Sequence, residues 1–128
     1  MNSQVEVLFI KIKVKGYLKN ITENTKEIIS TNAIKNKNKL TYIDNETSHI
    51  IEIKDKKIIL IRENQEFIHK FIFDIDNITK SEYYIKEFNT SIDVSIKTTK
   101  ISQTPNRISI DYEIIDNKNK YIYILDME

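Results

Sequence analysis

The sequence predicts an all-β protein, an up-and-down antiparallel meander closed into a barrel of about 8–10 strands. Three features favour this fold. Apolar and polar residues alternate along most of the chain, β-branched isoleucine fills many apolar positions, and short polar breaks separate the alternating segments. Successive side chains of a strand point to opposite faces, so each segment has one apolar and one polar face. Closing the meander removes its exposed edges.

The alternation is clearest in three segments. Residues 8–15 place aliphatic side chains on one face and mostly lysines on the other, and residues 92–97 and 108–114 repeat this pattern. A helix would scatter the same residues around its axis, so all three segments are predicted as strands. Gly16 is the only glycine and continues the apolar face of the first segment, where we expect a bend or a close backbone approach.

Short polar breaks predict hairpin turns between the strands. They are Asn20–Asn24, Asn36–Lys39, Asp44–Thr47, Asp55–Lys57, Glu63–Glu66, Asp74–Asn77, Phe88–Ser91, Gln103–Asn106 and Asp116–Lys120. Because glycine is almost absent, asparagine is expected to adopt the positive φ of such turns, at Asn36, Asn64, Asn89 and Asn117. Residues 78–88 have apolar residues at mixed spacing, and a strand is the favoured interpretation there.

Composition limits the possible functions. The 128 residues suit a single domain, residues 1–128, and 40% hydrophobic content is enough for one core. A net charge of +1, spread along the chain, argues against binding to nucleic acid or a membrane surface. The chain lacks cysteine, which excludes disulfides, thiol catalysis and cysteine-ligated metals. We therefore expect a cytoplasmic location, and no signal peptide or apolar span of roughly 20 residues is found.

The order of five segments carries a resemblance to a known family. These segments are residues 58–62, residues 71–73, Tyr84 with Phe88–Asn89, residues 92–98 and residues 108–114. Together they resemble the YwiB-like bacterial proteins of unassigned function, which are small calycin-like (lipocalin-like) β-barrels. The chain departs from the family at Ala33, Asn64 and Asn89 or Thr90, where members tend to have glycine. The resemblance implies a barrel and no activity.

Three polar residues share the apolar phase of their segments: His49, Arg62 and His69. Since a strand alternates its faces, these side chains should point toward the barrel interior or its rim. An inward arginine needs an acceptor or an open mouth, because burying an unpaired charge is costly. One hypothesis is a small carboxylate or amphipathic ligand bound at the mouth by these residues and a tyrosine, Tyr84 or Tyr112. The alternative is that backbone carbonyls and water satisfy them.

No catalytic or metal-binding pattern is evident, so we expect a non-enzymatic protein without a cofactor. Two histidines without cysteine are too few for a typical metal site. Ser48 and His49 are adjacent in sequence and point to opposite faces of a strand, which argues against a nucleophilic triad. Asp74 and Asp76 form a close carboxylate pair, but they lie in a break where turn-forming aspartate is expected. A single glycine excludes a glycine-rich phosphate loop.

The terminal strands suggest a second type of function. Tyr121 and Tyr123 alternate with isoleucine, so both faces of the last strand are apolar, and Val5, Val7 and Phe9 lie on the lysine face of the first strand. A meander places these strands side by side, which predicts a homodimer or partner surface. The alternative is a covering terminal segment. The first interpretation remains a calycin-like binding barrel, whose bulky isoleucine and phenylalanine side chains favour a filled or nearly filled interior.

Overall fold

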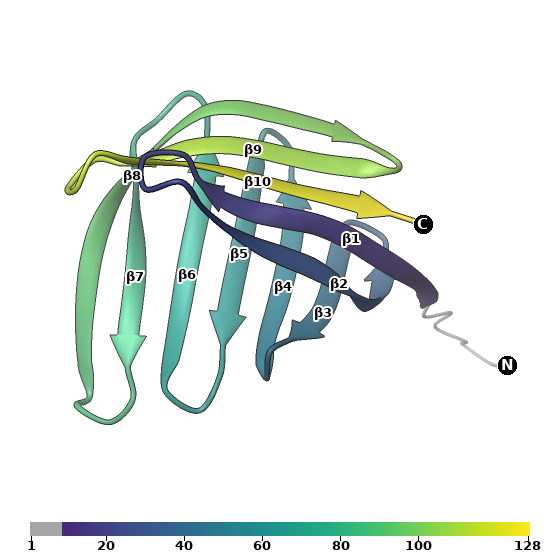
Figure 1. The fold of residues 1–128 in the computed structure, drawn as a ribbon, viewed down its shortest axis with the longest axis horizontal. Coiled ribbons are helices and arrows are strands. Elements are labelled where there is room, and N and C mark those ends of the chain that lie inside the picture. The colour runs from purple at the N-terminus through teal and green to yellow at the C-terminus, as the bar shows by residue number, and fades with distance from the viewer. Residues whose placement is uncertain (1–8) are drawn as a thin grey trace, which may run out of the picture.

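The computed structural model describes residues 9–128, and this part of the chain forms ten strands and no helix. The strands are β1 (Ile10–Asn20), β2 (Thr25–Asn36), β3 (Lys39–Asp44), β4 (Thr47–Lys54), β5 (Lys57–Glu63), β6 (Phe67–Asp74), β7 (Thr79–Ile85), β8 (Thr90–Thr104), β9 (Arg107–Ile114) and β10 (Asn119–Met127). Each strand pairs antiparallel with the next, and β1 pairs with β10, so the meander closes into a barrel (Figure 1). The all-β barrel prediction is confirmed.

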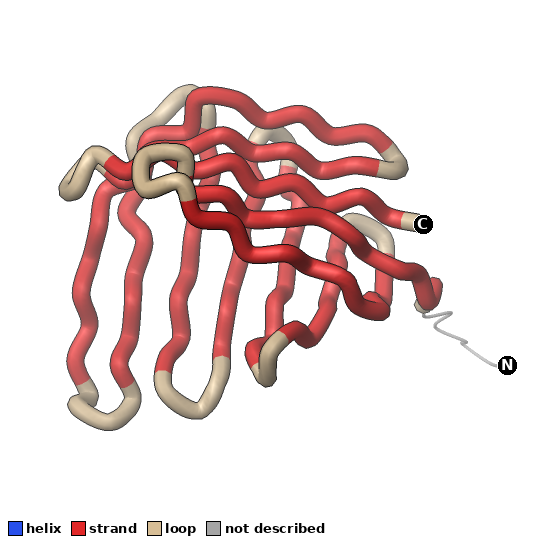
Figure 2. The backbone as a smooth tube through the Cα atoms, viewed as in Figure 1, coloured by secondary structure: helices blue, strands red, loops and turns tan. Residues whose placement is uncertain are grey.

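Short turns join the strands throughout (Figure 2). Each of the nine predicted breaks overlaps one of these turns, and β7 lies within residues 78–88, where a strand was the favoured interpretation. The positions of the polar breaks in the sequence therefore predict the turns that connect the strands.

The predicted asparagine turns are only partly correct. Asn89 has a positive φ of 46°, whereas Asn36, Asn64 and Asn117 do not. Lys37 and Lys118, one residue later in two of these turns, adopt φ values of 54° and 61° instead. Asparagine serves these turns with its side chain, since the Asn64 Oδ1 accepts hydrogen bonds from the backbone N–H groups of residues 66 and 67. Asn117 Oδ1 accepts one from the N–H of residue 119 in the same way.

The strands run in two directions, β1, β9 and β10 nearly across β3–β7 in Figure 1. Their inward side chains meet in one core. The most deeply buried members are Val14, Tyr42, Ile51, Ile58, Phe73, Ile96, Ile108, Ile110 and Leu125. Aromatic contacts join the two groups of strands, for example between Phe73 of β6 and Tyr112 of β9, whose ring centroids are 4.9 Å apart.

Gly16 lets the backbone of β10 approach β1 closely, which is one of the two roles expected for this glycine. It pairs with Leu125 of β10 and has a negative φ, so conformational freedom is not the reason for glycine here. A Cβ atom at this position would collide with the carbonyl group of Ile124. The missing side chain therefore allows β1 to pair with β10, and we call this pairing, which closes the barrel, the seam.

Pairing between β2 and β3 is incomplete. β2 pairs with β1 from Thr25 to Lys35, but with β3 only over Ala33–Asn36. The first eight residues of β2 therefore form a strand edge without a β3 partner. In Figure 1 the ends of β5, β6 and β7 near the turns at residues 64–66 and 86–89 extend beyond this edge. This end of the barrel positions the candidate site.

Candidate functional site

One continuous row of cross-strand neighbours runs over the inner face of β3–β8. The register pairs each member with the next: Tyr42 with His49, His49 with Arg62, Arg62 with His69, His69 with Tyr83 and Tyr83 with Ile92. Directly opposed residues of an antiparallel pair share a face, so all six side chains lie on the same face. We call this set the polar row.

Exposure increases along the polar row. Tyr42 and His49 are buried, with 2% and 6% of their surface exposed. Arg62, His69 and Tyr83 are half-buried, and Ile92 is 50% exposed although it points inward. The row thus begins in the core and ends at an open part of the inner face.

His49 is held as a neutral imidazole. Its Nδ1 lies 3.1 Å from the carbonyl oxygen of Thr47, which can only accept, so Nδ1 carries the proton. The unprotonated Nε2 then accepts a hydrogen bond of 3.3 Å from Arg62 Nε. Burial, with the Arg62 charge as a second cause, lowers the pKa of His49 from 6.5 to about 4. The Tyr42 ring stacks on the imidazole at 4.4 Å.

His69 is also neutral. The hydroxyl of Ser81 donates to the carbonyl oxygen of Lys70 at 2.8 Å, so its oxygen accepts from His69 Nε2 at 2.9 Å. Burial and then the Arg62 charge lower the pKa of His69 to about 4. The two histidines thus flank Arg62 without adding positive charge at neutral pH.

Arg62 is the charged centre of the polar row. Among residues 9–128 no carboxylate forms an ion pair with it, and the adjacent Glu63 pairs with Lys86 at 2.9 Å instead. The other arginine, Arg107, is bound by both carboxylate oxygens of Asp126 on the outside of the barrel. The Arg62 guanidinium lies 5.8 Å from the centroid of the Phe67 ring, a cation–π contact at the open end of the row.

The interior beside Arg62 is almost filled. A cavity of about 20 Å³ is bordered by Arg62, His49, Tyr42 and residues of β1, β2, β9 and β10, including Glu27. This volume holds about one water molecule. The interior beside Arg62 is thus nearly filled, whereas the other end of the polar row is open, with Ile92 50% exposed.

At the inner end of the polar row, its buried member Tyr42 is joined to the buried Tyr123 of β10. The hydroxyl groups of Tyr42 and Tyr123 share a hydrogen bond of 2.5 Å. Burial is the largest cause that raises the pKa of both phenols above the ordinary value of 10, so both stay protonated near neutral pH. This pair closes the inner end of the site.

The structure brings together four of the five predicted ligand residues. His49, Arg62 and His69 are adjacent in the polar row. Tyr112 of β9 borders the same small cavity as His49 and Arg62, and burial raises its pKa. Tyr84 is a correction: it lies on the outer face, and its hydroxyl donates to the Asn89 side chain. Tyr83 takes the inner position, because the register pairs it with His69.

Sequence reasoning missed Tyr42 and Tyr83. Tyr42 has a detectable signal, since it shares the phase of Leu40 and the break at Asp44–Thr47 brings the next strand beside it. Tyr83 and Tyr84 are adjacent, and the mixed spacing of residues 78–88 leaves their phase ambiguous. Only the pairing of β7 with β6 decides which one faces inward.

The predicted terminal surface is not assembled as expected. Tyr123 is only 4% exposed and lies in the core, and Tyr121 stacks on Tyr112 inside the barrel at 5.0 Å. Phe9 is 63% exposed, whereas Val5 and Val7 lie outside the described residues. Tyr121 and Tyr123 face inward because the register of β10 with β9 places them opposite the inward residues Tyr112 and Ile110.

The paired carboxylates and possible metal ligands of residues 9–128 were also compared with known kinds of site. No group of three or more histidine, aspartate or glutamate side chains gathers there in a metal-like cluster. Asp74 instead organises a turn, accepting hydrogen bonds from the Asp76 N–H and the Asn77 side chain, and these lower its pKa. No helix able to span a bilayer occurs in this part of the chain.

These features define a class: antiparallel up-and-down β-barrels whose inner face carries a polar row at one open end. The crystal structure of the YwiB protein from Bacillus subtilis is similar, with a TM-score of 0.62 and 16% sequence identity over 94% of this chain and 92% of that chain. The similarity confirms the expected YwiB-like barrel at the level of the fold. No protein-family model and no curated protein sequence matches the chain.

Proposed function

We propose that this barrel is a non-enzymatic binding protein that holds a small carboxylate-bearing ligand at the open end of the polar row. The observation that supports the proposal is Arg62, an inward guanidinium that forms no ion pair among residues 9–128 and is flanked by two neutral histidines. A guanidinium binds a carboxylate through two parallel hydrogen bonds, and low local polarity strengthens them.

The surroundings of Arg62 favour an amphipathic ligand. Phe67 and Tyr83 stack with ring centroids 5.2 Å apart, and Ile92 continues this apolar surface toward solvent. A ligand with a carboxylate and an aromatic or aliphatic tail would pair its charge with Arg62 and lay its tail on these side chains. A purely hydrophilic anion would gain only the first contact.

Thermal unfolding in the presence of carboxylates tests the proposal. We expect about 10 mM benzoate, phenylbutyrate or octanoate to raise the Tm of the wild type and of Arg107→Gln, and to leave Arg62→Gln unchanged. A ligand at 100 times its Kd adds about 2.7 kcal/mol to the unfolding free energy, a shift of several degrees for a domain of this size. Equal shifts in both arginine variants, or none in the wild type, would contradict it.

A homodimer and a cytoplasmic location remain predictions. The lack of cysteine supports a reducing compartment. Native mass spectrometry of the purified protein would report the oligomeric state and any ligand that co-purifies with the chain.

A further inference from the structure

The first part of β2 is an open strand edge. Residues Thr25–Asn32 pair with β1 on one side, while the register with β3 begins only at Ala33. Most of this segment is exposed, including Ile28 at 63%. A strand edge presents unpaired N–H and C=O groups and is a template for another strand.

The pairing pattern identifies which groups of β2 face outward from the edge. Lys13 of β1 exchanges both backbone hydrogen bonds with Glu128, on the side of β10. Antiparallel pairing alternates, so odd-numbered residues of β1 bond toward β10 and even-numbered ones toward β2. The register of β1 with β2 then directs the N–H and C=O groups of Lys26, Ile28 and Ser30 away from β1, to the open edge.

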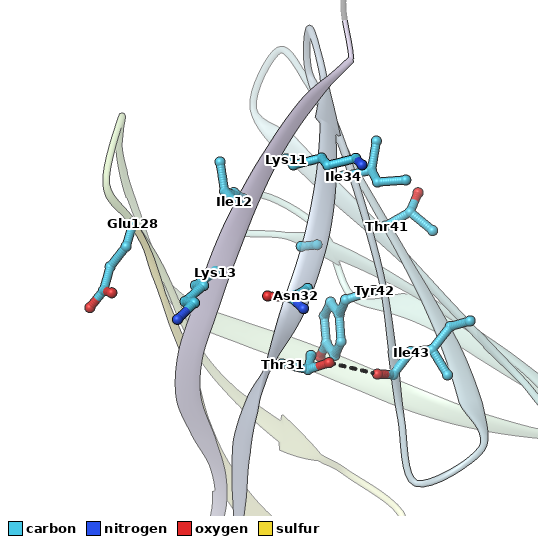
Figure 3. Close-up of a pocket in the computed structure, with 11 residues that line it drawn as sticks. Lys11, Ile12, Lys13, Thr31, Asn32, Ile34, Thr41, Tyr42, Ile43 and Glu128 are labelled. Carbon is cyan, nitrogen blue, oxygen red and sulfur yellow. Dashed lines mark hydrogen bonds between the residues drawn. The ribbon is translucent and has the colours of Figure 1, made fainter.

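A surface hollow lies at each end of this open edge of β2. A hollow of about 270 Å³ lies beside Thr25, Lys26 and Glu27, and one of about 680 Å³ lies where β2 and β3 separate. Figure 3 shows the second: the Thr31 hydroxyl donates to the Ile43 carbonyl across the gap between the strands. Between the two hollows, Glu27 and Ile29 border the same cavity as Arg62.

We propose that the edge of β2 accepts an extended acidic peptide as an additional antiparallel strand. The backbone of the peptide would bond to Lys26, Ile28 and Ser30. Its inward side chains would cover Phe67 and Tyr83, with one carboxylate reaching Arg62. Main-chain bonds provide affinity in such complexes, and pockets for alternate side chains provide specificity. The carboxylate contact rests on the proposed function, whereas the strand contact does not.

A peptide fits this edge better than a second copy of the chain. Suppose that two barrels joined their β2 edges to form one continuous sheet. Both barrel interiors would then lie on the same side of that sheet, and the ends of β5–β7 of each barrel would lie beneath the β2 edge of the other. These ends extend beyond the edge in Figure 1, so the two barrels would have to fit both sets of ends into the same space. A single strand has no such extension.

The test compares Ser30→Pro with Ser30→Ala, using a pool of eight-residue peptides that alternate apolar and polar positions around a central glutamate. Proline removes the outward N–H of residue 30 and is tolerated on an open edge, whereas alanine keeps that donor. Amide chemical shifts of the labelled protein report the binding position. We expect shifts at Lys26, Ile28 and residue 30 in the wild type and Ser30→Ala, and about tenfold weaker binding by Ser30→Pro.

A second probe avoids dependence on the folding of the proline variant. Peptides methylated on the backbone nitrogens that face β2 should lose binding to the wild type, while peptides methylated on the opposite nitrogens should keep it. Equal binding of both methylated pools, equal binding by the two Ser30 variants, or shifts away from β2 would overturn the proposal. So would a dimer that dissociates only in Ser30→Pro.

Replacing the central glutamate by glutamine separates this proposal from the proposed function. Unchanged binding at the β2 edge would support the added strand and argue against the carboxylate contact at Arg62. If benzoate binds in a way that depends on Arg62 and no peptide binds, the added-strand proposal is overturned and the proposed function stands.

Discussion

The hydrogen bonds of His49 are arranged for the neutral ring, whereas His69 makes one bond, from Nε2 to the Ser81 hydroxyl. In His49 the protonated Nδ1 faces the Thr47 carbonyl and the bare Nε2 faces an Arg62 N–H. Protonation of His49 at Nε2 would direct its new N–H at the N–H of Arg62. It would also place two positive charges side by side in a buried site. Burial is the main reason that both histidines stay uncharged, and the nearby Arg62 charge adds to it.

Stability should fall as the pH drops from about 6.5 to 4. Both histidines have a folded pKa of about 4, below the ordinary value of 6.5, so in this window the unfolded chain binds more protons than the folded one. We expect each to remove about 2–3 kcal/mol of unfolding free energy by pH 4, less where solvent screens the site. Urea unfolding at pH 7 and pH 4.5 measures the loss.

His49→Gln and His69→Gln provide the control for this pH dependence. The chain has two histidines, so the double variant retains only the contribution of its carboxylates. We expect each single variant to remove about half of the histidine-dependent loss. A double variant that loses as much stability as the wild type would show that the histidines are not responsible.

The buried tyrosine pair should behave as a coupled unit. Removing one hydroxyl in Tyr42→Phe or Tyr123→Phe leaves the other buried without its partner, which costs about 1–3 kcal/mol. The double variant removes both polar groups and keeps the ring volumes, so its cost should be clearly smaller than the sum of the two. Unfolding free energies from urea titrations complete this cycle, and strict additivity would contradict the coupling.

At the level of elements, the seam between β1 and β10 depends on the missing side chain at Gly16. Its Cβ would collide with a backbone carbonyl, which can move only by separating the paired strands. We expect Gly16→Ala to lower the unfolding free energy by about 2–3 kcal/mol, at the upper end of overpacking costs. Lys15→Ala, an exposed neighbour in the same strand, should change it by less than about 0.5 kcal/mol. Equal effects of both would exclude the collision.

The turn between β9 and β10 offers a stabilising substitution. Lys118 holds a φ of 61°, a left-handed conformation that costs a residue with a side chain about 1–2 kcal/mol. Lys118→Gly should therefore raise the unfolding free energy by about 0.5–1 kcal/mol after the entropy cost of glycine. Asn117→Gly is the matched control in the same turn and should destabilise, because it removes the Asn117 bond to the Asn119 N–H. A similar gain from both would contradict this assignment.

The strands and turns could be predicted because their causes are local. Alternation fixes the face of each side chain in a strand such as β9, and polar breaks mark the hairpins. Tyr84 and Tyr123 were misassigned where this local signal fails. Both neighbours at Tyr83–Tyr84 are aromatic, and both faces of β10 are apolar, so the register with the next strand decides. The sequence also does not show that β2 leaves β3 at Ala33.

At the level of the molecule, the site depends on closure of the whole barrel. Strands β3–β8 supply the polar row, but the cavity beside Arg62 is completed by Leu18 of β1 and Tyr123 of β10. The bond between Tyr42 and Tyr123 joins residues 81 positions apart in sequence. The inner end of the site therefore forms only when the two ends of the meander have met.

Closure of the barrel should be a late step in folding. Pairing β1 with β10 brings together Val14 and Met127, and loop-closure entropy must be overcome before this contact stabilises the fold. The β4–β5 hairpin closes over two turn residues, so its contacts form at little entropic cost. We expect Leu125→Ala at the seam mainly to accelerate unfolding, with a φ-value near 0, and Ile51→Ala in β4 mainly to slow folding.

Both side chains are almost fully buried, 0% exposed for Leu125 and 1% for Ile51, so each truncation should cost about 2–5 kcal/mol, enough for a reliable φ-value. Stopped-flow chevrons of the two variants measure the rates. A φ-value for Leu125→Ala as high as that for Ile51→Ala would place closure in the folding nucleus. The polar row and its inner wall would then form together, because β10 would already be seated against β1 when the central hairpins pack.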